Sequence, residues 1–249
     1  MISDKLIRAA KTLRKETERM TFSAPITHVY NPLIYAWAPH EMYLARFGAS
    51  RKKVVFLGMN PGPFGMVQTG VPFGEISAVK NWLRIEGPIG RPKSEHPRRR
   101  ITGFDCPRSE ISGQRLWGLF ADRFETADRF FSTHIVLNYC PLAFLESSGR
   151  NRTPDKLTSV ERTKLGEVCD RHLLEVVTVL CPEWVIGIGD FASRRAEQVL
   201  SGSAVKVGRI LHPSPASPAA NRDWAGVVAR QLETLKVWDQ AKSARENRS

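Results

Sequence analysis

The chain has 249 residues, of which 42% are hydrophobic and 25% charged, and its formal net charge is +12. This length is enough for one domain with a buried core. The chain lacks any run of about 18 apolar residues, so no transmembrane helix is expected. Its first twenty residues lack the apolar segment of a signal peptide. We therefore expect a cytoplasmic, nucleoid-associated or nuclear monomer with no membrane partner.

The excess of basic residues favours a polyanionic partner. Each lysine or arginine placed against a phosphate releases a condensed counterion, which favours binding to nucleic acid. The basic side chains cluster at 51–53, 91–100 and 194–195. The second cluster lies within 87–107, where glycine, proline and basic residues alternate, so a basic loop is expected there. A basic surface without a selective partner would explain the composition equally well.

The four cysteines, Cys106, Cys140, Cys169 and Cys181, include no C-x-x-C pair. Zinc and iron–sulfur sites usually contain at least one such close pair. We therefore expect free thiols in a reducing compartment, and neither a metal nor another cofactor.

Four short apolar runs predict buried strands, at 54–57, 135–137, 184–188 and 205–211. Continuous apolar runs of this length are typical of strands that are covered on both faces. Helical patterns lie between them. This alternation predicts an α/β fold, with a single three-layer domain over 1–249 in which helices flank a central four-stranded parallel sheet.

Five segments with helical periodicity predict the main helices. The first two cover about 3–20 and 109–124. The periodic segment 154–180 predicts one long helix, with Thr153 as its N-cap and Pro154 at its first position. A fourth helix is expected over 190–200. The last should begin at Ser217-Pro218 and reach about Val237, before a frayed tail over about 239–249.

Three of the predicted strands run directly into a polar side chain that a proline follows closely. These side chains are Asn60, Asn138 and His212. Ligands of parallel α/β sheets bind at the carboxyl ends of the strands. Prolines stiffen the turns, so the three side chains are expected to be held rigidly at one rim of the sheet.

Longer motifs surround these residues: GMNPGPFGMVQTGVPFGE (58–75), CPRSEISGQRLWGLF (106–120), NYCPL (138–142) and HPSPASPAANRDW (212–224). In these motifs the chain resembles the single-strand-selective monofunctional uracil-DNA glycosylases, from about residue 30 to about residue 235. The resemblance implies a DNA-repair enzyme that flips uracil out of single- or double-stranded DNA. It would hydrolyse the N-glycosidic bond without a metal and leave an abasic site.

The resemblance assigns the catalytic roles to Asn60 and His212. Asn60 would position the attacking water, because a carboxamide has no useful proton affinity near neutral pH. His212 would donate a hydrogen bond to uracil O2 as negative charge develops there. Taken alone, an asparagine before a proline is most often a turn residue, and a single histidine can simply cap a strand. The sequence leaves the protonation state of His212 open.

The same resemblance implies a base pocket. Asn138 would read the base, since one carboxamide matches both O4 and N3–H of uracil, whereas cytosine presents the inverted pattern. Phe73 would stack under the base, although an aromatic residue here is also typical of core packing. Met59, Gly62 and Met66 would line the pocket. Glycine at 62 leaves room at C5, so we expect tolerance of small polar substituents such as hydroxymethyl.

The segment that begins at Pro213 resembles the loop and helix start that wedge into DNA and replace the flipped base. DNA contacts are expected from Pro213, Ser214, Pro215, Ala216, Ser217 and Arg222. Alanine stands at 216, where family members carry a bulky basic residue. We therefore expect a weak wedge, for which Arg222 would compensate in part, while backbone N–H groups near Ser217 could bind a phosphate.

Three other functions fit parts of the sequence. Gly187, Gly189 and Ala192 outline a dinucleotide-binding turn, but Asp190 would repel a pyrophosphate and Arg209 stands where an acid is expected. A non-catalytic damaged-DNA-binding module would use the charge and the wedge, but not the catalytic pair. A glycosylase for deaminated purines would depend on pocket volume. A lyase activity is not expected, because the three rim motifs contain no lysine.

Overall fold

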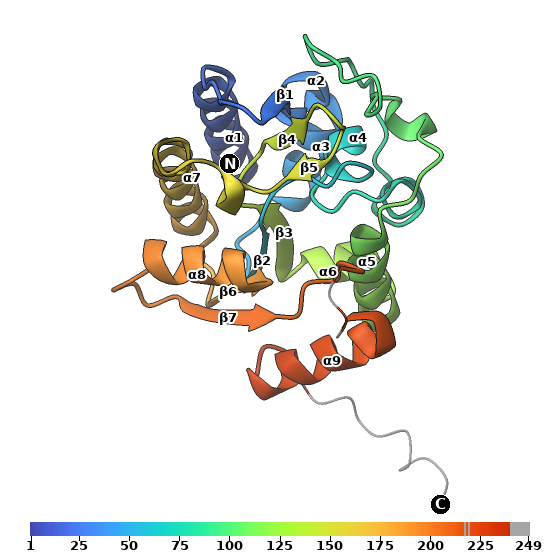
Figure 1. Cartoon of the computed structure of the whole chain (residues 1–249). Coiled ribbons are helices and arrows are strands. Elements are labelled where there is room, and N and C mark those ends of the chain that lie inside the picture. The colour runs from blue at the N-terminus through green and yellow to red at the C-terminus, as the bar shows by residue number, and fades with distance from the viewer. Residues whose placement is uncertain (217, 219, 240–249) are drawn as a thin grey trace, which may run out of the picture.

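The computed structural model describes residues 1–216, 218 and 220–239. A four-stranded parallel sheet with the strand order β3-β2-β6-β7 lies at its centre (Figure 1). Its strands are β2 (Val54–Gly58), β3 (His134–Asn138), β6 (Trp184–Ile188) and β7 (Lys206–Ile210). All four predicted strands are confirmed, each to within one residue at either end.

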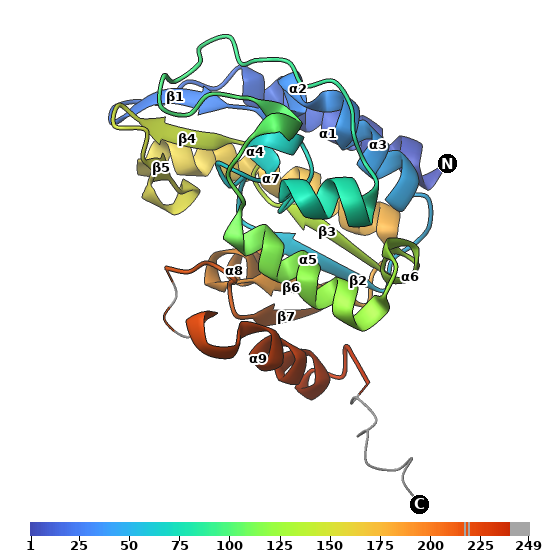
Figure 2. The same cartoon turned by 90° about the vertical axis from the view of Figure 1, so that its right-hand side faces the viewer.

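Helices cover both faces of this sheet, and its central strands β2 and β6 are correspondingly apolar on both sides. One face carries α7 (Ser159–Leu180) and α8 (Asp190–Val199), with α1 (Ile2–Glu18) packed against α7. The other carries α5 (Ile111–Phe124), α6 (Ala127–Phe131) and α9 (Ala220–Thr234), as Figure 2 shows. The predicted three-layer α/β fold is confirmed.

Short elements fill the connections before and after β2. They are α2 (Pro32–Tyr35), α3 (Trp37–Phe47), α4 (Met66–Thr69), the π-helix η1 (Ala78–Leu83) and the 3-10 turn η2 (Gly103–Asp105). Apart from η2, the basic segment 87–107 forms no helix or strand, as expected. Within the described residues, no helix is both long and apolar enough to cross a membrane.

A second, antiparallel sheet was not predicted. It contains β1 (Ile26–Tyr30), β4 (Ala143–Glu146) and β5 (Asn151–Arg152). These strands are four or five residues long or shorter, and the apolar residues of β4 continue the run that begins after β3, so sequence periodicity did not separate them. The sheet matters for function because β4 begins just after the rim segment 138–142, and β5 brings Asn151 beside that rim.

The predicted helix over 154–180 is wrong in its first turn. Pro154–Lys156 form a separate 3-10 turn, η3, and α7 begins only at Ser159. Its N-cap is Thr158, whose hydroxyl accepts the N–H of Glu161 while the Glu161 carboxylate accepts the N–H of Thr158. This capping box satisfies two backbone donors, whereas the predicted cap, Thr153, makes no side-chain capping bond.

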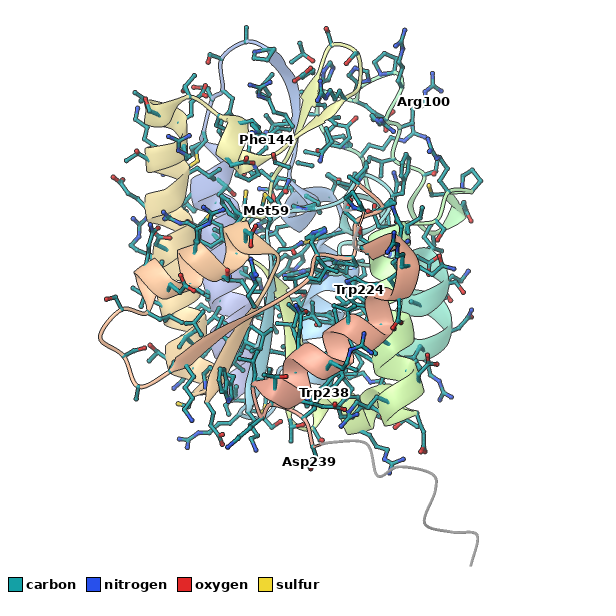
Figure 3. All side chains as sticks on the ribbon, turned by 60° about the horizontal axis from the view of Figure 1, so that its bottom comes forward. Met59, Arg100, Phe144, Trp224, Trp238 and Asp239 are labelled. Atoms are coloured by element: carbon teal, nitrogen blue, oxygen red, sulfur yellow. The ribbon has the colours of Figure 1, made fainter. Side chains whose placement is uncertain are left out.

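The C-terminal helix also starts later than predicted, at Ala220, and has non-helical torsion angles at Asp223. Ser217 and the predicted tail beyond 239 lie outside the described residues. The last described turn places Trp238 under the sheet, in a core region with Phe120 and Phe124. Figure 3 shows Trp238 well separated from Met59, which follows the carboxyl end of β2.

Candidate active site

One cavity of about 340 Å³ opens at the carboxyl ends of the parallel strands. All seven residues that the sequence assigned to catalysis or base binding line it: Met59, Asn60, Gly62, Met66, Phe73, Asn138 and His212. They come from the segments that follow β2, β3 and β7. The expected convergence at one rim is therefore present in the structure.

The backbone holds two of these segments in register beyond the strands themselves. The N–H of Tyr139 donates to the carbonyl of Gly58, and the N–H of Cys140 donates to the carbonyl of Met59, both over 2.9 Å. The ends of β2 and β3 thus stay paired up to the rim. This pairing fixes the spacing between Asn60 and Asn138 before any ligand enters.

The carboxamide of Asn60 is oriented from outside the cavity. Its Nδ2 donates to the carbonyl oxygen of Leu142 over 3.1 Å. A carbonyl can only accept, so this bond settles which end of the amide is the nitrogen. The Asn60 Oδ1 remains as an acceptor at the cavity, which is the orientation that holding a water by its hydrogen requires.

His212 is held in one tautomer. The N–H of Ser214 donates to its Nδ1 over 3.0 Å, so Nδ1 is an acceptor and carries no proton. Burial lowers the pKa of His212 below its usual value of 6.5. The imidazole is therefore neutral at pH 7, with its proton on Nε2, and no described residue forms a hydrogen bond with that Nε2.

Asn138 has incomplete hydrogen bonding. Its Nδ2 contacts the sulfur of Met66 at 3.1 Å, a weak acceptor, and its buried Oδ1 has no partner within the described part of the chain. The Oδ1 of Asn151, which also lines the cavity, is likewise buried and unpartnered. Unsatisfied buried polar atoms cost stability. Among the described residues there are three, and two of them belong to these cavity-lining asparagines, while the third is the Nδ1 of His172 on α7.

Phe73 adopts a strained backbone conformation beside this cavity, with φ of +50°. Its carbonyl is held by the indole N–H of Trp117 at 3.0 Å and the N–H of Glu75 at 2.7 Å. Its ring lies directly on Gly58, where a Cβ would approach Cε2 to 2.5 Å. Glycine at 58 therefore lets the aromatic ring form part of the floor of the cavity.

Besides Pro61 and Pro63, the cavity is lined by four polar residues that the sequence did not assign: Glu110, Ser112, Asn151 and Thr153. Glu110 lies immediately before α5, and a Cβ on Gly62 would meet its carboxylate at 2.6 Å. Glu110 belongs to the CPRSEISG motif, and this motif could have pointed to it. The site residues were predicted because they follow strands, and this motif does not follow one.

The segment 213–216 is anchored from α5 and α9. Arg115 donates to the carbonyl of Pro213 at 3.0 Å and to the Oδ1 of Asn221 at 3.1 Å, and Asn221 in turn donates to the carbonyl of Pro215 at 2.9 Å. Pro215 and Ala216 are exposed at its tip. Arg222 is also exposed, in the first turn of α9.

A second groove, of about 600 Å³, starts at Met59 and His212 and leads away from the cavity. Arg162 and Arg194 line it, and neither forms an ion pair with a described residue. The half-buried ring of Phe191 belongs to the same lining, as do Asp155 and Asp190, the latter paired with Arg209. Arginines beside an aromatic ring suit an anionic strand with stacking bases.

The glycines of the proposed dinucleotide turn have packing roles instead. A Cβ on Gly187 would approach the backbone nitrogen of Ser193 to 2.3 Å, so glycine allows α8 to lie close on β6. Gly189 has φ of +88° and lies against His212. Asp190 forms an ion pair with Arg209. Among the described residues, no group of three or more histidine, cysteine or acidic side chains is arranged to hold a metal.

Comparison with known proteins identifies the family. A family model described as the uracil DNA glycosylase superfamily matches residues 45–241. The chain belongs to this superfamily. The single-strand selective monofunctional uracil DNA glycosylase of Bos taurus is 46% identical over 225 residues, which are 90% of this chain and 83% of that protein. The protein of the same name from Mus musculus is 44% identical over 90% of this chain and 81% of its own length.

The fold agrees with a solved structure of the superfamily. The crystal structure of wild-type SMUG2 from Pedobacter heparinus superposes with a TM-score of 0.64 at 15% identity, covering 92% of this chain and 97% of that one. The resemblance to the single-strand selective monofunctional uracil-DNA glycosylases and the enzyme class, a hydrolase of N-glycosidic bonds, are thus confirmed. Uracil removal in base excision repair follows from this membership.

Proposed function

We propose that this enzyme flips uracil, and uracil with small polar C5 substituents, out of DNA into the cavity at the strand ends and hydrolyses its N-glycosidic bond. The observation that carries the proposal is the incomplete hydrogen bonding of three side chains in this cavity. Asn60, Asn138 and His212 each present a polar atom that no described residue satisfies. A polar ligand would complete these bonds.

His212 stabilises the leaving group. As the bond between C1′ and N1 breaks, its electron pair passes to uracil and negative charge develops on O2. The Nε2–H of neutral His212 donates a hydrogen bond to O2. Because Ser214 already fixes the tautomer, no proton has to be rearranged during the reaction. A fixed donor aimed at developing charge typically contributes ~10²–10³ in rate.

Asn60 positions the water that acts as the nucleophile. Its Oδ1 accepts a hydrogen from a water and orients the lone pair of that water toward C1′. The water oxygen bonds to C1′ and its proton passes to solvent, while the uracil anion takes up a proton from solvent. The products are free uracil and an abasic deoxyribose. Asn60 does not need to take the proton, since the departing base leaves C1′ strongly electrophilic.

Asn138 and Phe73 select the base. The Asn138 carboxamide can turn from Met66 to donate to O4 and accept from N3–H, which are the two groups that distinguish uracil from cytosine. The Phe73 ring offers a stacking surface at the floor of the cavity. The exposed tip of 213–216, with Arg222 beside it, occupies the place of the extruded base.

The DNA strand on either side of the lesion is bound electrostatically. The groove with Arg162 and Arg194 begins at the cavity, and the net charge of +12 favours phosphate binding. Extrusion costs least from single-stranded DNA, where no base pair is broken. The enzyme is therefore expected to act on single strands and, with lower efficiency, on duplexes.

The test is uracil excision from a fluorescent single-stranded oligonucleotide with EDTA present, where alkali reveals the abasic sites. The wild type should cleave, and Asn60→Ala should lower the single-turnover rate by roughly 10²-fold or more. Asn81→Ala is the matched control, because Asn81 is exposed on η1 and does not line the cavity. It should retain the wild-type rate.

Two results would contradict the proposal. If the wild type binds the oligonucleotide without cleaving uracil, the activity lies elsewhere, and hypoxanthine substrates then distinguish a purine glycosylase from a binding module. If Asn60→Ala and Asn81→Ala cleave equally fast, Asn60 does not act in the reaction.

A further inference from the structure

A second pocket, of about 310 Å³, lies between α7 and α8, which are neighbours on the same face of the sheet (Figure 1). Its volume is close to that of the cavity at the strand ends, which is about 340 Å³. The groove described above joins the two. Met59 and His212 line both the cavity and the groove. Arg162, Phe191 and Arg195 line both the groove and this α7–α8 pocket, so a DNA strand that leaves the cavity along the groove reaches the pocket.

One side of the α7–α8 pocket is held in place by its own hydrogen bonds. Arg195 forms an ion pair with Asp170. The hydroxyl of Tyr139 donates to the Oδ1 of Asp170 over 2.6 Å and accepts the Nε–H of Arg195 over 3.1 Å. A Cβ on Gly166 would approach a guanidinium nitrogen of Arg195 to 3.2 Å, so glycine leaves room for this group beside α7. Because these side chains satisfy one another, the pocket is already formed in the free protein.

The charges on the lining of the pocket balance one another. The charged side chains are Arg162, Arg195, Glu167 and Asp170. The groove differs, because Arg194 lines it as well and one of its two acids, Asp190, is paired with Arg209. Phosphates are therefore expected along the groove, whereas the pocket suits an uncharged group with hydrogen-bonding edges.

Phe191 offers a flat apolar surface where the groove meets the pocket. Its ring is half-buried and packs against Tyr139 in a T-shaped arrangement, with the ring centroids 5.8 Å apart. In this arrangement Tyr139 covers at most one face of the Phe191 ring. Aromatic faces stack nucleobases regardless of sequence, because every base has a π-face.

We propose that the α7–α8 pocket binds an unpaired nucleobase that neighbours the lesion on the same DNA strand, while the intervening phosphates follow the arginines of the groove. The inference rests on the proposed function, which puts the lesion in the cavity where the groove begins. A single strand can turn a neighbouring base into the pocket without breaking a base pair. In a duplex that base is paired and stacked, and its extrusion costs free energy. The pocket thus provides a contact that single strands make and duplexes do not.

The test removes one neighbouring base at a time. Single-stranded oligonucleotides carry one uracil and, at one of the two nearest positions on either side, a tetrahydrofuran unit that keeps the phosphates but has no base. Single-turnover excision over a range of enzyme concentrations gives the half-saturating concentration and the maximal rate separately. For the wild type, one of these replacements should raise the half-saturating concentration by roughly 10-fold, the typical effect of one stacked base, and leave the maximal rate nearly unchanged.

Phe191→Leu keeps an apolar side chain and removes the flat ring. This variant should bind the complete strand about as weakly as the wild type binds the strand without the base, and should not respond to removal of that base. Phe191→Tyr keeps the ring and should retain the response. Phe22→Leu is the matched control, because Phe22 is also half-buried with a T-shaped aromatic neighbour, Phe144, and lines neither the cavity, the groove nor the pocket.

Duplex substrates separate loss of this contact from loss of the fold. Phe191→Leu should raise the half-saturating concentration much less on duplexes than on single strands, and equal losses on both would overturn the inference. The inference is also wrong if no replacement weakens binding by the wild type, or if Phe191→Leu responds to the replacement as the wild type does. In each of these cases the proposed function stands as long as the wild type excises uracil. If the wild type does not excise uracil, the proposed function itself is wrong.

Discussion

Each end of the parallel sheet carries a histidine, buried at the amino end and half-buried at the carboxyl end, and the two differ in their hydrogen-bond partners. At the amino end, His134 stacks on Phe56 and Phe130, its Nδ1 meets the hydroxyl of Thr133 at 2.8 Å, and its Nε2 accepts the indole N–H of Trp238 at 3.2 Å. At the carboxyl end, the Nδ1 of His212 has a partner, and its Nε2 has none within residues 1–216, 218 and 220–239.

This difference shows which of the two histidines can still bind a ligand. A buried polar group that is fully satisfied stabilises the fold and has nothing left to offer a ligand. A buried group with one unsatisfied atom at a cavity costs stability until a ligand arrives. The asparagines repeat the pattern. Asn31 caps α2 and also donates to Thr17, whereas the Oδ1 of Asn138 has no partner among the described residues.

Paired alanine variants of the two histidines test this comparison most directly. His212→Ala should lower the single-turnover rate of uracil excision by roughly 10²–10³-fold, because the donor to O2 is lost. His134→Ala should leave that rate near the wild-type value, and should lower the free energy of unfolding by roughly 2–4 kcal/mol through the cavity and the orphaned Trp238 N–H. Denaturant unfolding and single-turnover kinetics on both proteins provide the measurements.

The comparison fails if His134→Ala, at a temperature where it is folded, slows excision as strongly as His212→Ala. It also fails if His212→Ala loses more stability than His134→Ala.

Acid should destabilise the fold through its buried structural histidines. Burial lowers the pKa of His40, His134 and His172 to about 4, from 6.5 in the unfolded chain. The unfolded state therefore takes up protons that the folded state does not. Stability is complete above pH 6.5 and falls as the pH drops toward 4, by roughly 2 kcal/mol for each histidine at pH 5.

Denaturant unfolding at pH 7.5, 6 and 5 measures this fall. The variant His134→Phe removes one of the three groups while keeping an aromatic ring, so its stability should depend less steeply on pH. Equal pH dependence of the two proteins would show that His134 is not buried as a neutral imidazole.

The smallest expected effect concerns the exposed tip at the carboxyl end. Ala216→Arg supplies a long basic side chain where Pro215 and Ala216 are exposed. Excision from duplex DNA should rise about 3–10-fold, because insertion into the stack offsets part of the cost of extrusion. Excision from single strands should change less. The matched control is Arg8→Ala, which alters one exposed charge on α1, away from the cavity.

A uniform rise on both substrates would show that residue 216 acts only through its charge. Such a result would remove the wedge from the proposed mechanism.

The sequence predicted the rim of the site better than its walls. Asn60, Asn138 and His212 each follow an apolar run that is typical of a buried strand, and parallel strands bring their carboxyl ends together. Glu110 and Asn151 come from a helix start and a two-residue edge strand. Their position depends on how distant segments pack, which no local periodicity encodes.

Two other parts of the fold, the start of α7 and the antiparallel sheet, could not be predicted because of local features of the sequence. The break at Leu157 interrupts a segment whose apolar spacing continues across it, and the competing cap at Thr158 decided where α7 begins. The antiparallel sheet was missed because its strands are too short for alternation to be recognised. The tautomer of His212 depends on one backbone N–H, from Ser214, whose direction no sequence pattern encodes.

The start of α5 joins features that would otherwise be independent. Glu110 lies just before it, a Cβ on Gly113 would approach the Phe73 carbonyl to 2.1 Å, and Arg115 one half-turn later holds the carbonyl of Pro213. One rigid helix end thus contacts the cavity wall at Gly62, the backbone of Phe73 and the segment 213–216. Under the proposed function, a substitution that moved this turn would change base selection and the contact with DNA together.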